Sequence, residues 1–353
     1  MAADRGFSQP ADFERLTATV SAEFQVEGFV LEHNVPTYYL KQPQETKQAF
    51  LNLVKELSSM NLTATLRKVD GKLVLKVLPK PPVKPSNVLA NLALFFATVA
   101  TTFVAGYLIS PGTMDPCVGG ASFAVAMLAV LGAHEMGHKI AANKRGVNAT
   151  PPYFIPGPPP LGTFGAVIVQ KSHAPNRDAL FDVGVAGPIA GFIVSTVVSA
   201  VGLTMLIPSP QVPAHAIGKP LLWDLLEAGL GSLNMIPSPP PNGLLLLHPI
   251  AFAGWAGIIV TMLNLLPAGM LDGGHAVRAV AGGKLRLVLT ALSIFYLVVL
   301  RVYLMAVLVL LTSVCRHPGP LDDVSSLSRS RKLLAVALIA IFVLCTPPSF
   351  HLL

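Results

Sequence analysis

The chain has 353 residues, of which 52% are hydrophobic and only 12% charged, and its mean hydropathy is +0.62. Because soluble domains carry about 25% charged residues, this composition argues against a soluble fold. The net charge of +7 is compatible with nucleic-acid binding, but no basic run is interleaved with aromatic residues, so we expect no nucleic-acid partner. The three cysteines are far apart and form no C-x-x-C pair, which indicates neither a disulfide framework nor a cysteine metal site.

Residues 1–78 have an ordinary composition and predict a small soluble α+β head. In chain order the patterns predict two strands, a helix and a hairpin around Asp70-Gly71, at residues 24–31, 37–40, 46–57 and 62–77. Residues 79–86 contain four prolines and are expected to form a stiff, extended linker. The N-terminus shows no early apolar core of the signal-peptide kind, so we expect the first span to direct membrane insertion.

Residues 87–353 predict a polytopic α-helical membrane domain with about six or seven spans. Its apolar runs approach or exceed the roughly 20 residues that a bilayer helix needs. They lie at residues 87–110, 118–133, 183–207, 248–266, 287–314 and 333–343. Arg301 interrupts the fifth run, which is compatible with one long tilted helix or with two short ones.

The distribution of Lys and Arg predicts how these spans are oriented. Residues 1–86 carry eleven of them and residues 139–177 carry five, whereas residues 208–247 carry only Lys219. By the positive-inside rule the head is then cytoplasmic, and we expect an integral, multi-pass protein of the cell membrane.

The motif H-E-M-G-H at residues 134–138 follows the second apolar run. At helical spacing, His134 and His138 lie one turn apart on the same face, where both imidazoles can bind one zinc ion. Glu135 then lies close enough to activate a water, which is the arrangement of H-E-x-x-H metalloproteases. The alternative is a pair of helix-end histidines near the polar interface. Ionisable residues in such a place are costly, however, and indicate function.

A catalytic zinc site usually takes a third protein ligand. No acidic residue occurs between Glu227 and Asp272, and Asp272 follows the fourth apolar run within N-L-L-P-A-G-M-L-D-G-G-H, residues 264–275. Proline and glycine break the helix there and free the carboxylate to point at a neighbour. His275 is a competing ligand, and a helix cap or a loop position is the alternative role for Asp272.

Together, the two motifs resemble the site-2 protease family of intramembrane zinc metalloproteases, in particular its prokaryotic members. The segments at residues 161–168, 181–191 and 316–323 resemble further family segments, so the likeness covers roughly residues 86–345. The resemblance implies one catalytic zinc ion with Glu135 as general base and with three ligands, His134, His138 and Asp272. It also implies that Asn264 steadies the substrate or the developing oxyanion, and an interhelical hydrogen bond is the alternative.

Between these motifs, the proline-rich residues 151–160 cannot be helical, and residues 162–170 are typical of a strand. A strand edge can hold a substrate in extended form by main-chain pairing, and the family resemblance implies a sheet near the active site. We therefore expect Gly162, Phe164 and Gly165 to bind substrate, with a plain connecting hairpin as the alternative.

Small residues in the third apolar run have a structural interpretation. We expect Gly184, Gly187 and Gly191 to let neighbouring helices approach closely.

The predicted function is that of a zinc-dependent intramembrane metallo-endopeptidase, which hydrolyses a peptide bond in or near a transmembrane segment of partner membrane proteins. A metal transporter or a metal-binding scaffold would use the same ligands but would not need Glu135 between the two histidines. A catalytically inactive relative that binds substrates is the third hypothesis, and the intact motif argues against it. The expected partners are transmembrane substrates and the lipid bilayer, and the sequence does not indicate an oligomeric state.

Overall fold

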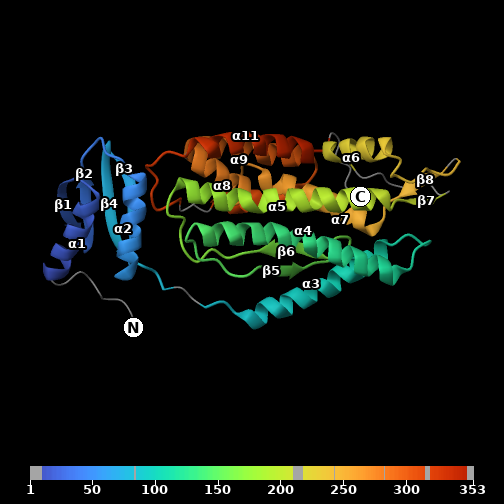
Figure 1. Cartoon of the computed structure of the whole chain (residues 1–353), viewed down its shortest axis with the longest axis horizontal. Helices are drawn as coiled ribbons and strands as arrows, with labels where there is room; N and C mark the ends of the chain where they lie inside the picture. The colour runs from blue at the N-terminus through green and yellow to red at the C-terminus, as the bar shows by residue number, and fades with distance from the viewer. Residues whose placement is uncertain are drawn as a thin grey trace.

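The computed structural model describes residues 10–82, 85–209, 218–241, 243–281, 283–314 and 319–347. It consists of an α+β head at one end and a mostly helical body whose long helices run away from the head (Figure 1). A mostly helical chain with an N-terminal α+β region is thereby confirmed, and the polytopic membrane character of the body stays a prediction. Parts of three predicted features lie outside the described residues, at Cys315, in the linker and in the last family segment.

The head is a four-stranded antiparallel sheet that shares one hydrophobic core with two helices. Its elements are α1 (Pro10–Glu23), β1 (Val26–Glu32), β2 (Val35–Leu40), α2 (Lys47–Ser59), β3 (Leu62–Val69) and β4 (Lys72–Pro79), in the strand order β1-β2-β4-β3. The predicted hairpin is β3–β4. Its turn residues Asp70 and Gly71 have φ angles of +48° and +81°, as a type I′ turn requires. Helix α1 is not among the predicted elements, although its Leu16 and Val20 are fully inside the core.

Within the described ranges, three body helices are long and apolar enough to cross a membrane, namely α3 (Val88–Ile109), α4 (Pro116–Lys144) and α5 (Arg177–Thr204). Each begins at a polar cap, because the side chains of Asn87, Asp115 and Asn176 accept hydrogen bonds from backbone N–H groups of the first turn. Helix α4 continues well past the apolar run, so H-E-M-G-H lies inside the helix and not at its end.

The other body helices are shorter. They are α6 (Leu221–Ser232), α7 (Pro249–Leu265), α8 (Asp272–Ala281), α9 (Gly283–Val299), α10 (Tyr303–Val314) and α11 (Arg329–Cys345). The run at 287–314 forms two helices, α9 and α10, which pack against each other and are separated at Arg301, where φ is +60°. At about 1.5 Å per residue, α10 is about 18 Å long, well short of the roughly 30 Å of a bilayer core.

The body also contains two small antiparallel sheets, the hairpin of β5 (Tyr153–Pro156) with β6 (Thr163–Val167) and the pair of β7 (Ile207–Ser209) with β8 (Leu244–Leu246), between which α6 lies in the chain. The β5–β6 hairpin lies between α3 and α4 (Figure 1). Backbone pairing extends beyond it, because Thr150 N donates to Val169 O and Lys171 N donates to Asn148 O. The extended segment predicted after the prolines is therefore present, with β6 as its regular part.

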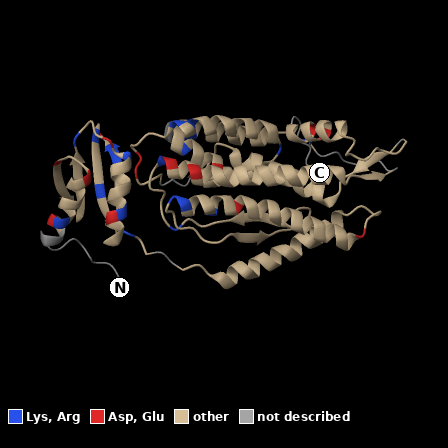
Figure 2. Cartoon of the chain, in the orientation of Figure 1, with Lys and Arg blue, Asp and Glu red and all other residues tan. Residues whose placement is uncertain are grey.

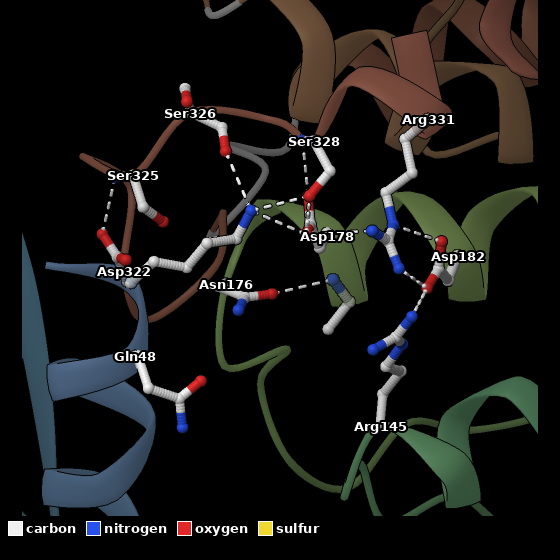
Figure 3. A network of polar contacts seen from close by, with 12 residues as sticks. Gln48, Arg145, Asn176, Asp178, Asp182, Asp322, Ser325, Ser326, Ser328 and Arg331 are labelled. Carbon is white, nitrogen blue, oxygen red and sulfur yellow. Dashed lines mark hydrogen bonds and ion pairs between the residues drawn. The ribbon is translucent and has the colours of Figure 1, made fainter. Parts of the chain in front are cut away.

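An ionic network joins the head to the body (Figure 3). Lys47 Nζ of α2 lies 2.7 Å from Asp178 Oδ2 in the first turn of α5. Arg331 of α11 contacts Asp178 and, one turn further along α5, Asp182. Arg145, directly after α4, also pairs with Asp182. The network therefore fixes the head-side ends of α4, α5 and α11 beside α2.

Candidate metal centre

Two buried histidines on one face of α4 form the first part of the site. His134 and His138 are one turn apart and only 5% and 6% exposed. Their Nε2 atoms lie 3.2 Å from each other, so both imidazoles point to the same place. This is the consequence of an i, i+4 spacing inside a regular helix.

Asp272 reaches the same place from the start of α8. Between α7 and α8 the chain turns back on itself through Gly269, which has a φ of +51°. A Cβ atom on Gly273 would lie 2.2 Å from Leu265 O, so the start of α8 packs against the end of α7 at a distance that only glycine permits. As a result, Asp272 Oδ2 lies 3.1 Å from His134 Nε2 and 3.2 Å from His138 Nε2.

The three atoms have the spacing of ligands around one metal ion. Zinc bonds of about 2.0 to 2.1 Å in tetrahedral geometry place ligand atoms roughly 3.3 Å from one another. The observed separations of 3.1 to 3.2 Å fit this value. In the described part of the chain, no other group of His, Cys, Asp and Glu side chains meets this condition.

Contacts from α5 hold the imidazoles in place. His138 Nδ1 lies 2.6 Å from Val183 O. Since a carbonyl oxygen can only accept, Nδ1 donates this hydrogen bond and the lone pair of Nε2 points at the ligand group. A Cβ on Gly187 would lie 2.1 Å from His138 Nε2, and one on Gly191 would lie 3.0 Å from His134 Nδ1. The glycines predicted to allow close helix approach thus make room for the two rings.

Two further polar side chains border the ligand group. Glu135 is 7% exposed, and its carboxylate interacts with the backbone of Ile168, just beyond β6. Asn264, in the last turn of α7, places Nδ2 3.4 Å from His134 Nε2. A carboxylate, an amide and three ligand atoms therefore meet in one buried site.

A comparison with protein families shows to which family the chain belongs. The model of peptidase family M50 matches residues 122–307, which is more than half of the chain. The chain belongs to this family. The predicted resemblance to the site-2 protease family is therefore confirmed.

The curated proteins similar to this chain include plant proteins. "Probable zinc metalloprotease EGY1, chloroplastic" from Arabidopsis thaliana is 36% identical over 64% of this chain and 42% of the relative. "Probable zinc metalloprotease EGY2, chloroplastic" from the same plant is 32% identical over 47% of this chain and 29% of the relative. The chain thus spans less than half the length of these relatives. They do not bear out the expected likeness to prokaryotic members, and no solved structure matches the chain.

The M50 structure brings together most of the residues predicted for the site. His134, His138 and Asp272 form the ligand group, with Glu135 and Asn264 beside them. The competing candidate His275 is not in this group, since it lies at Gly184, where a Cβ would be 2.9 Å from His275 Cβ.

The three residues predicted to bind substrate have different surroundings. Gly162 packs against α3, because its φ is +71° and a Cβ would lie 2.5 Å from Thr101 O. This contact is with the protein's own backbone, so Gly162 has a packing role. Phe164 is 68% exposed and Gly165, with a φ of +105°, borders open space. Only these last two are placed where a second chain has access.

Proposed function

We propose that this M50 protein is a zinc-dependent endopeptidase that acts within the membrane and hydrolyses a peptide bond in or near a transmembrane segment of a partner protein. The observation that carries the proposal is the triangle of His134 Nε2, His138 Nε2 and Asp272 Oδ2, with Glu135 adjacent on α4. The relatives' printed names, which contain "zinc metalloprotease", support the same chemistry. A metal transporter would not need a buried carboxylate beside the ligands.

Each side chain has a distinct part in this proposal. A zinc ion held by the three ligands would act as a Lewis acid, polarising the scissile carbonyl and lowering the pKa of water. Glu135 is the general base, which accepts a proton from the attacking water and delivers it to the leaving nitrogen. Asn264 would donate a hydrogen bond to the oxygen that becomes negative in the transition state. The hydrogen bond from His138 Nδ1 to Val183 O keeps the ligand ring in one tautomer.

The β5–β6 hairpin is the proposed substrate platform. A peptide bond inside a helix is shielded by the helix backbone, so a substrate has to become extended before attack. Strand β6 belongs to a two-stranded sheet, which leaves one of its edges without a strand partner among the described residues. Because Ile168 follows β6 and interacts with Glu135, a substrate paired along that edge would be led to the base.

The three long apolar helices support a membrane location. His138 and His134 lie six and ten residues before the end of α4, which corresponds to about 9 and 15 Å along its axis. The site would then lie inside the bilayer, nearer its head side. The relatives' names contain the word "chloroplastic" and do not support a cell-membrane location for this chain. The cytoplasmic head and the six or seven spans stay predictions.

Metal content and cleavage, measured on the same purified variants, test the proposal. The full chain is reconstituted in vesicles with a panel of membrane-spanning substrates, with and without a chelator. Glu135→Gln should keep about one zinc ion per chain and lose cleavage, since the substitution removes only the base. Asp272→Asn should lose both, and His275→Ala should lose neither.

Three results would contradict the proposal. A Glu135→Gln variant that still cleaves would exclude this carboxylate as the base. Full zinc and activity in Asp272→Asn, with both lost in His275→Ala, would transfer the ligand role to His275. A wild-type protein that binds zinc but cleaves no substrate would favour the metal-binding scaffold.

A further inference from the structure

Helix α8 carries a candidate metal ligand at one end and an arginine at the other. Asp272 is its first residue and Arg278 lies in its last turn. Arg278 donates from Nη1 to Asp323 Oδ1 at 3.0 Å and from Nη2 to Asp323 Oδ2 at 2.5 Å. The Arg278 and Asp323 side chains are 14% and 17% exposed. This two-bonded, largely buried pair is the strong form of an arginine–carboxylate contact.

Asp323 is itself anchored to both parts of the molecule. On the body side, Arg177 at the start of α5 donates to Asp323 Oδ1 at 3.2 Å and to Asp323 O at 2.7 Å. On the head side, Asp323 N donates to Leu66 O of β3 at 3.2 Å, and Leu66 N donates to Leu321 O at 2.9 Å. The segment 321–323 therefore continues the edge of the head sheet and also ties down the last turn of α8.

The start of α8 has few side chains that could anchor it. Gly273 and Gly274 follow Asp272 directly, and both are pressed against backbone carbonyls of the α7–α8 turn. The helix has only ten residues, about 15 Å, so a tether in its last turn limits tilting and sliding of the whole element. The Arg278 guanidinium also packs against Gly319, where a Cβ would lie 2.8 Å from Arg278 Nη2.

We propose that Arg278 and Asp323 are positioning residues that hold α8 so that Asp272 stays within ligand distance of His134 and His138. The head becomes a structural part of the metal site through this pair, because Asp323 is hydrogen-bonded to β3. The pair touches neither substrate nor reacting atoms and acts only through α8. The inference rests on the proposed function in so far as the site binds zinc.

Zinc affinity of the full-length protein, measured by competition with a chromogenic chelator, tests the pair. Arg278→Gln and Asp323→Asn should weaken zinc binding roughly 10- to 100-fold, the usual effect of losing a group that orients a ligand. Arg278→Lys keeps the charge but cannot make both hydrogen bonds to Asp323, so its zinc affinity should fall less than that of Arg278→Gln. It also serves as the test variant if Arg278→Gln does not fold. Lys47→Gln is the matched control, because it removes a head–body contact with Asp178 that does not involve α8.

Hydrogen exchange of α8 without added metal provides a second readout that does not depend on catalysis. Exchange at residues 272–281 should be faster in Arg278→Gln and Asp323→Asn than in the wild type and in Lys47→Gln. Wild-type affinity in both pair variants, or an equal loss in Lys47→Gln, would overturn the inference. If the wild type binds zinc but cleaves no substrate, the proposed peptidase activity is contradicted. The zinc affinities of the wild type and the pair variants still test the positioning role. If the wild type binds no zinc, unchanged exchange in the pair variants would overturn the tether as well.

Discussion

At the residue scale, the position of His138 depends on Gly187, because this glycine has no Cβ atom to occupy the space of the imidazole. Gly187 faces the imidazole, and a methyl group there would lie 2.1 Å from Nε2, the atom that points at the ligand group. The ring is also held by Val183 O, so it cannot move aside without losing that hydrogen bond. We expect Gly187→Ala to lower zinc affinity at least about tenfold, measured by chelator competition, because it displaces a ligand.

Gly229→Ala in α6 is the control for this substitution, since a Cβ there meets nothing within 4 Å. It should leave zinc affinity unchanged, because alanine is favourable in a helix. Gly191→Ala should be milder than Gly187→Ala, since the corresponding contact with His134 Nδ1 is 3.0 Å. Equal zinc binding by Gly187→Ala and the wild type would mean that α5 can move away from α4 at no cost to the site.

The residues that the sequence identifies at the site are those whose side-chain chemistry is tied to spacing. His134 and His138 are recognisable because an i, i+4 pair in a helix has only one geometry. Asp272 is recognisable because it is the first acidic residue after Glu227 and follows a predicted helix break, and the structure places it beside the two histidines. The contacts of Val183 O and of the Ile168 backbone were missed, because a backbone group leaves no trace in residue identity. Gly184, Gly187 and Gly191 predict close approach of helices, but they do not indicate which side chains occupy the space.

At the element scale, the exposed β6 strand gives a prediction about substrate contact. Phe164 is the most accessible of the residues assigned to substrate, and it lies on the same strand that leads to Ile168 and Glu135. A photo-crosslinking amino acid in place of Phe164 should capture a transmembrane substrate in a Glu135→Gln background, where cleavage does not remove it. The measurement is the yield of crosslinked product on a denaturing gel.

Leu225 of α6 is a suitable control position, since it is 55% exposed and lies on a different element. A crosslinker there should capture little substrate. Equal yields at the two positions would show that substrate contact is nonspecific and that β6 is a plain connecting hairpin.

Elements were predicted best where hydropathy and backbone structure coincide. The apolar run of α3 and the helix itself agree to within one or two residues. In α4 they diverge. Hydropathy alone indicates an end at residue 133, but the helix continues through His134 and Glu135 to Lys144. In the run at 287–314, Arg301 marks the place of the break, but a single charged residue does not decide between one helix and two, which the left-handed backbone of Arg301 settles in favour of two. Helix α1 was missed because its two core positions stand among many polar residues.

At the scale of the whole molecule, charge divides the protein along its long axis. Lys, Arg, Asp and Glu concentrate in the head and at the head-side ends of α4, α5 and α11 (Figure 2). Lys47 and Asp178 pair across the joint between head and body, and Asp323, which pairs with Arg278, is hydrogen-bonded through its backbone to β3. Lys47 and Asp178 therefore help to dock the head, and the proposed membrane location would leave this charged end of the body outside the hydrocarbon region. The count of basic residues predicts the charged end of the molecule but not the docking contact, since Lys47 and Asp178 lie more than 100 residues apart in the sequence.

This division predicts that the head and the α6 end of the body lie on opposite sides of the membrane. Residues 1–86 carry eleven Lys and Arg residues, whereas residues 208–247 carry only Lys219, and moving the basic end across a bilayer is disfavoured. The test uses a variant with all three native cysteines replaced by alanine, expressed in bacterial cells, and a thiol reagent that does not cross membranes. In intact cells Glu227→Cys should be labelled and Lys72→Cys should not, while in lysed cells both should react. If Lys72→Cys and Glu227→Cys were both labelled in intact cells, both ends would lie on one side, and α3, α4 and α5 could not all three cross the membrane.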